Sequence, residues 1–176
     1  TMTVVDRPTW RTTSHLLAGY SGSASELFVI DIPGEEFPRV LQVVSQLPEV
    51  QVHVLSGEPV EPPAPLDEAL LDRMGRHTAQ ESEHNILGSA YGTNEHLQIY
   101  ISTPVGVGTF DVEFVFWNDL SFPADLDAAE RSRRLERLVA LAEACRSSSS
   151  TSRCIPSDEH NGDPRELLEN EYAVIW

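Results

Sequence analysis

Lysine is absent from this sequence, and all twelve of its basic residues are arginine. The 28 aspartates and glutamates leave a formal net charge of −16 with histidine neutral. A surface this negative repels the phosphate backbone of nucleic acids and the headgroups of anionic lipids. The charge therefore argues against nucleic-acid binding and against docking on a membrane, and it favours a basic protein or a cation as partner.

Long apolar runs are also missing. No stretch approaches the roughly 20 apolar residues that span a bilayer, and the first residues lack the basic-then-apolar order of a secretory signal. We therefore expect a cytoplasmic protein. The closely spaced glycines, Gly88 with Gly92 and Gly106 with Gly108, form neither a G-x-G-x-x-G nor a Walker sequence. We expect no cofactor.

Cysteine is scarce. The two cysteines, Cys145 and Cys154, are nine residues apart and match no C-x-x-C redox or zinc pattern. We interpret them as free thiols. A disulfide that closes the Ser/Thr-rich loop at about 147–153 is the alternative if the protein meets an oxidising compartment.

Length and composition predict one folded domain. The chain has 176 residues, of which 40% are hydrophobic, close to ordinary globular values. We expect residues 1–176 to form a single α+β domain, in which helices pack on a mixed or mainly antiparallel sheet. The oligomeric state stays open.

Hydrophobic periodicity places the main elements. Apolar alternation or continuous apolar runs predict strands at about 13–18, 27–32, 50–54, 96–102 and 110–116. Apolar residues at helical spacing predict helices at 37–47, about 66–74 and 127–146. The strand at 27–32 is apolar throughout, which is typical of burial on both faces. The strands at 96–102 and 110–116 predict an antiparallel hairpin.

Proline and polar residues predict the irregular segments. Four prolines and two glutamates at about 57–65 predict a surface connector without regular structure. The polar composition of 155–163 predicts a loop, and 164–169 is expected to form a short helical turn. Residues 173–176 are expected to be an edge strand or a plug in the core.

One cluster has the composition of a metal site. His77, Glu81 and His84 have the spacing i, i+4 and i+7, which would bring three ligands to one helical face. The order is not H-E-x-x-H, and the surrounding stretch has no clear period. A solvated polar segment is therefore the favoured interpretation, and a small metal-dependent hydrolase is the alternative function.

Two further charge patterns have structural and functional interpretations. Asp111 and Glu113 lie two apart on one strand, which suits either paired carboxylates for acid/base chemistry or simply the polar face of the strand. The four arginines between 131 and 137 suit a phosphate-binding patch or a solvated helix face. The polar-face and solvated-face interpretations are favoured because acids are so numerous.

Aromatic residues beside acids suggest a protein-binding surface. Trp117 ends the strand at 110–116 and is followed by a loop rich in acids, although a place at the edge of the core would also suit it. By their loop positions, we select these partner-binding candidates: Trp117, Asp119, Asp125, Asp158, Glu159 and Asp163.

The segment FDVEFVFWNDLSFP, from Phe110 to Pro123, precedes an amphipathic helix and a late NGDPRELL segment. This C-terminal part resembles the immunity proteins of bacterial polymorphic-toxin systems. The resemblance implies a small, acidic, cytoplasmic α+β protein that binds and blocks a toxin, often a basic nuclease, so that the chemistry belongs to the partner. We therefore predict a binding protein that neutralises a basic partner and is not an enzyme.

Overall fold

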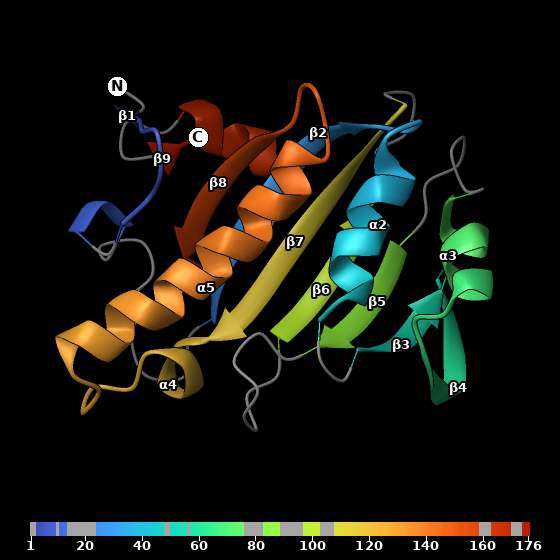
Figure 1. Cartoon of the computed structure of the whole chain (residues 1–176), viewed down its shortest axis with the longest axis horizontal. Coiled ribbons are helices and arrows are strands. Elements are labelled where there is room, and N and C mark those ends of the chain that lie inside the picture. Colours follow the sequence, from blue (N-terminus) through green and yellow to red (C-terminus); the bar gives the residue numbers. More distant parts are fainter. Residues whose placement is uncertain are drawn as a thin grey trace.

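The computed structural model describes residues 3–9, 11–13, 24–47, 50–55, 57–75, 83–88, 97–102, 108–158, 163–169 and 174–176, and the structural statements below concern these residues. A seven-stranded antiparallel sheet forms the centre of the structure (Figure 1). Its order is β4 (Glu58–Pro65), β3 (Gln51–Leu55), β5 (Glu83–Gly88), β6 (Leu97–Ser102), β7 (Thr109–Trp117), β2 (Ala24–Pro33) and β8 (Arg153–Asp158). Two short parallel strands, β1 (Thr3–Val4) and β9 (Val174–Ile175), form a second sheet.

Two helices cover one face of the large sheet. Figure 1 shows α2 (Phe37–Ser45) and α5 (Ala128–Ser147) side by side across it. Helix α2 connects β2 to β3, and α5 follows β7 and the short helix α4 (Asn118–Ser121) and leads to β8. Because every neighbouring pair is antiparallel, β2 runs in the same direction as β3, and β7 in the same direction as β8. Helix α3 (Glu68–Gly75) contacts α2.

The main core lies between this face and the helices. Alternate residues of β7 point into it, and the ring of Phe110 stacks on Phe37 of α2 with 3.8 Å between ring centroids. Helix α5 contributes a buried stripe at i, i+3, i+4 spacing. The stripe consists of Leu135, Leu138, Val139, Ala142 and Cys145. The α+β prediction, with helices packed on a mainly antiparallel sheet, is therefore confirmed.

Strand β2 is buried on both faces, as its continuous apolar run predicted. Leu27 and Val29 point into the main core, whereas Phe28 and Ile30 belong to a second cluster on the opposite face. That cluster includes Ile155 of β8 and packs against the short 3-10 helix η1 (Pro164–Glu169). The far end of the chain thus covers the second face of β2.

The other strand and helix predictions are mostly confirmed. The hairpin of β6 and β7, the strand β3 and the helices α2, α3 and α5 all lie within a few residues of the expected ranges. Helix α5 begins after Asp127, whose side chain accepts a hydrogen bond from the backbone N–H of Glu130. The expected turn at 164–169 is η1, and the expected C-terminal edge strand is β9, followed by the buried Trp176.

The connector predicted at 57–65 is wrong, because these residues form β4. Proline is tolerated there because β4 is an edge strand that pairs with β3 alone, and its outer side needs no N–H donors. Val60 and Ala64 also pack against the core. The prolines therefore lie within the edge strand of the sheet and do not interrupt the pairing of other strands.

Two more segments differ from expectation. The loop predicted at 155–163 begins as strand β8, which continues to Asp158 because Ile155 is buried against β2. The strand predicted at 13–18 starts at Thr13, which lies in a helical turn, and 14–18 lie outside the described residues. Within the described residues, no helix is long and apolar enough to cross a membrane.

Candidate functional site

Among the described residues, two large apolar side chains are exposed close together where the chain leaves β7. We call residues 117–125, which include α4, the α4 corner. Trp117 is 41% exposed and Leu120 is 48% exposed, large values for apolar side chains of this size. Asp119 and Asp125 are also exposed. The corner therefore combines an aromatic and an aliphatic side chain with carboxylates, as the sequence predicted for Trp117, Asp119 and Asp125.

Buried side chains beneath the corner explain why these residues point outward. Asn118, the first residue of α4, is 3% exposed, and its side-chain oxygen accepts a hydrogen bond of 2.7 Å from the Ser25 hydroxyl of β2. Phe122 packs edge-to-face on Phe116, with ring centroids 5.8 Å apart. Since the corner is anchored at 118 and 122, the side chains of Trp117, Asp119 and Leu120 face solvent, whereas Ser121 is buried.

Two arginines of α5 hold the corner from the side. The Nη1 group of Arg134 donates to the carbonyl oxygens of Leu120 and Ser121 at 3.1 and 3.2 Å. The Nη2 group of Arg131 donates to the carbonyl oxygen of Ala124 at 2.7 Å and, more weakly, to that of Pro123 at 3.4 Å. We call Arg131 and Arg134 the arginine clamp.

The clamp corrects part of the sequence interpretation. Arg133 and Arg137 are exposed, as expected of a solvated helix face. Arg131 and Arg134 are partly buried and bind backbone carbonyls, so the solvated-face prediction is wrong for them. Glu130 accepts hydrogen bonds from Arg134 and Arg133, and these hydrogen bonds lower the pKa of Glu130.

Of the remaining partner-binding candidates, Asp158 and Asp163 lie near opposite ends of β2. Ser25 of β2 pairs with Asp158 of β8 on one side and with Phe116 of β7 on the other. The backbone of Asp158 is therefore at the same end of the sheet as Trp117. Glu159 lies outside the described residues. Asp163 lies near the other end of β2, where it binds Arg165 beside Asp31. Six residues of strand separate the two ends, about 20 Å.

Asp163 belongs to an ion network that ties η1 to the sheet. Arg165 donates to Asp111 with Nη1–Oδ2 and Nη2–Oδ1 distances of 2.8 and 2.9 Å, and its Nε donates to Asp31 at 3.1 Å. Arg153 binds the other oxygen of Asp31 at 2.8 Å. Asp111 is thus bound by Arg165 and is buried, so the expectation that the pair marks a solvated strand face is wrong for Asp111.

Backbone geometry and charge meet at Asp31. This residue has a positive φ of 63° and interrupts the pairing of β2 with β7, where its N–H donates to the Asp111 carboxylate. Partial burial raises the pKa of Asp31, but hydrogen bonds from Arg153 and Arg165 outweigh it, so the pKa is lowered. Hydrogen bonds to Asp111 and Asp31 raise the pKa of Arg165. The Asp31 carboxylate therefore stays ionised at neutral pH.

His84, one of the three residues of the alternative metal site, lies on a strand and not on a helix. His84 belongs to β5, where it pairs with Ile101 of β6, and a strand does not bring residues at i, i+4 and i+7 together. His77 and Glu81 lie outside the described residues. Among the residues that are described, no group of three or more histidine, cysteine or acidic side chains could hold a metal ion.

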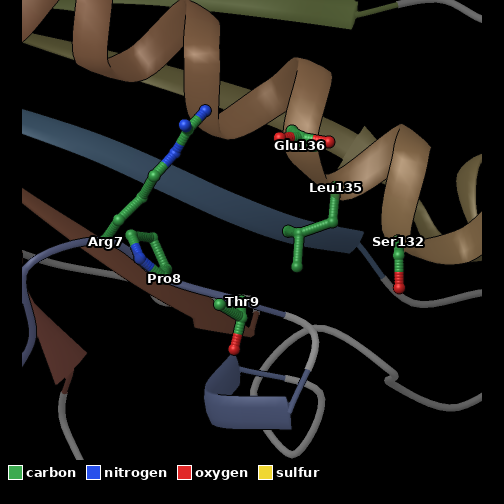
Figure 2. A pocket seen from close by; sticks show the side chains of 6 residues that line it. All are labelled: Arg7, Pro8, Thr9, Ser132, Leu135 and Glu136. Carbon is green, nitrogen blue, oxygen red and sulfur yellow. The ribbon is translucent and has the colours of Figure 1, made fainter.

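A small cleft of about 220 Å³ lies on the other flank of α5 (Figure 2). Figure 2 shows Leu135 and Ser132 projecting from the helix toward Pro8 and Thr9 of the N-terminal segment. Arg7 lines the cleft and forms an exposed ion pair with Glu143 at 3.6 Å. The cleft marks incomplete packing between the N-terminal segment and α5.

Sequence reasoning selected Trp117, Asp119 and Asp125, which the structure places on the α4 corner, but it did not select Leu120 or the arginine clamp. The spacing of Arg131 and Arg134, i and i+3 beside the buried stripe, was the available signal for a contact with a neighbouring segment. Comparison with known proteins adds no assignment, since no family model, no curated protein and no solved structure matches the chain.

Proposed function

We propose that this protein binds and neutralises a basic protein through the α4 corner. The observation that carries the proposal is the exposure of Trp117 and Leu120 on a corner fixed by buried anchors and flanked by Asp119 and Asp125. Rigid aromatic anchors beside charged groups are typical of the few residues that dominate binding energy in protein interfaces. The face of an indole also attracts the guanidinium or ammonium group of a basic side chain.

Long-range attraction comes from the whole molecule, because the arginines of α5 offset much of the charge near the corner. The net charge of −16 raises the rate at which a basic partner arrives and makes that rate fall with salt. The edge formed by β4 and α3 is especially acidic and has exposed carboxylates. They are Glu58, Glu61, Asp67, Glu68 and Asp72. In this proposal the acidic edge steers the partner, and the corner holds it.

The proposal agrees with the resemblance to toxin-immunity proteins, from which the partner would be a basic toxin met in the cytoplasm. An inhibitor of this kind supplies contacts and no chemistry, so we propose a binding protein and not an enzyme. The ion network around Arg165 fits this role as a structural element, since its carboxylates are occupied by arginine.

The charge contribution can be tested with poly-L-arginine as a basic probe and rapid-mixing kinetics at two salt concentrations. The double variant Asp119→Asn with Asp125→Asn removes two charges at the corner, and Glu58→Gln with Glu61→Gln removes two at the acidic edge. Both should lower the association rate. Only the corner variant should also raise the dissociation rate, because its carboxylates contact the bound probe.

The apolar contribution needs its own pair of variants. Trp117→Ala should weaken binding about tenfold or more, as expected of an anchor residue. Val4→Ala, at another exposed apolar side chain on the N-terminal strand, should leave affinity unchanged. If Trp117→Ala and the corner charge variant both bind the probe like the wild-type protein, the corner is not the binding surface.

A further inference from the structure

The arginine clamp places positive charge next to a surface that is proposed to bind a basic partner. A protein that binds a basic partner has four arginines in the first half of α5, and two of them contact the α4 corner. Two of them, Arg131 and Arg134, extend their guanidinium groups under the α4 corner instead of into solvent. Their charges repel a basic partner, so their presence needs a reason other than attraction.

The backbone of the corner supplies that reason. Helix α4 has four residues, too few to be stable alone, because helix formation needs a costly nucleus. Its last carbonyl groups have no following helical turn to bind them. Arg134 donates to two of these carbonyls, those of Leu120 and Ser121. Arg131 donates to the carbonyls of Pro123 and Ala124, which follow α4.

The clamp joins the corner to a rigid element. Arg134 is held in turn by Glu130 at 3.2 Å, and Glu130 lies in the first turn of α5, where Asp127 caps the helix. Hydrogen bonds from charged donors are stronger than neutral ones. The connection therefore runs from the capped start of α5, through two guanidinium groups, to the segment that presents Trp117 and Leu120.

We propose that Arg131 and Arg134 are positioning residues for partner binding: they hold the α4 corner in its binding conformation without touching the partner. This inference rests on the proposed function. A corner that is already ordered loses less conformational entropy on binding, so the complex forms with higher affinity than a loose corner would allow. The lower entropy loss of an ordered corner thus offsets the repulsion between the two arginines and a basic partner.

The proposal makes a prediction opposite to that of charge alone. Replacing an arginine by glutamine removes one positive charge, so electrostatics predicts tighter binding of poly-L-arginine by Arg134→Gln. Loss of the clamp predicts weaker binding, with dissociation about five to ten times faster. Arg137→Gln is the matched control, since Arg137 is exposed on the same helix and its loss changes charge equally. The control should bind equally or slightly more tightly.

Hydrogen exchange reports on the corner itself. The N–H of Phe122 donates to the carbonyl of Asn118 at 2.7 Å, and that of Leu126 donates to Pro123 at 3.0 Å. In Arg134→Gln and in Arg131→Gln these two amides should exchange about tenfold faster or more. The amides of β7 should exchange at the wild-type rate, which shows that the variants remain folded.

The outcomes separate the two proposals. Unchanged exchange at Phe122 and Leu126 in the clamp variants would overturn the positioning role. The role would also be overturned if exchange became faster but the clamp variants bound the probe as tightly as the wild type or more tightly, while the double variant Asp119→Asn with Asp125→Asn still bound the probe more weakly. If neither the corner charge variant nor Trp117→Ala affects the probe, the proposed function fails, and the positioning role fails with it. Faster exchange together with faster dissociation, in the clamp variants and not in Arg137→Gln, would support the clamp.

Discussion

Replacing Arg165 by glutamine should destabilise the fold much more than replacing an exposed arginine. Arg165 donates hydrogen bonds to Asp31, Asp111 and Asp163, which lie far from one another in the sequence. The Asp111 side chain is only 7% exposed. Without Arg165, this carboxylate keeps the N–H of Asp31 as a donor but loses its opposite charge.

The magnitude follows from the exposure of the groups. Removing one partner of a fully buried ion pair costs about 3–5 kcal/mol, whereas an exposed pair contributes about 0–1 kcal/mol. The side chains of Arg165 and Asp31 are 26% and 24% exposed, so water partly screens the network. We therefore expect Arg165→Gln to lower the free energy of unfolding by about 2–3 kcal/mol.

Urea unfolding followed by circular dichroism measures this loss, provided that the slope with denaturant is unchanged. Arg133→Gln is the control, because Arg133 is 63% exposed and pairs with Glu130, and its loss should cost less than about 0.5 kcal/mol. Adding Asp111→Asn to Arg165→Gln should restore part of the stability, since the buried side chain at position 111 then carries no charge. A loss for Arg165→Gln no larger than for Arg133→Gln would refute this reasoning.

Three further predictions concern single groups. Folding lowers the pKa of Asp31 from its ordinary value of 3.8, so the stabilisation that its ionised carboxylate contributes is complete above that pH and is lost as the pH falls through the folded pKa. The free energy of unfolding should therefore fall by more on acidification in the wild type than in Arg165→Gln. Burial raises the pKa of Cys145 to about 12 and also raises that of Cys154, so both free thiols should react with a thiol reagent at pH 8 only after unfolding; rapid labelling of the native protein would contradict their burial. Asp127→Ala should lower the free energy of unfolding by about 1 kcal/mol, measured by urea unfolding, while Asp127→Ser retains the helix cap and most of the stability.

The sequence predicts those elements whose neighbours along the chain determine their structure. Strand β7 alternates from Phe110 to Phe114, α2 and α5 have an apolar stripe, and β2 has an apolar run from Leu27 to Ile30, so local pattern and tertiary burial agree. Strand β4 could not be predicted in this way, because proline is compatible with a strand only at a sheet edge. Which strand forms the edge depends on the order of the whole sheet.

The α4 corner was predicted in part for a similar reason. Trp117 ends the strand pattern, and Asp119 and Asp125 lie in the acid-rich segment that follows, so their position along the chain made them candidates. The contacts that fix the corner join residues far apart in sequence, such as Ser25 with Asn118, or depend on which flank of α5 faces the corner. The ion network has the same character, since Asp31 and Arg165 are 134 residues apart.

The most direct test of the proposed binding surface is amide hydrogen exchange over the whole chain, with and without poly-L-arginine. If the α4 corner holds a basic partner, protection on binding should be greatest at residues 117–127, and it should be lost in Trp117→Ala. The acidic edge should show weak protection that disappears as salt increases. Protection confined to the acidic edge, with none at the corner, would contradict the account.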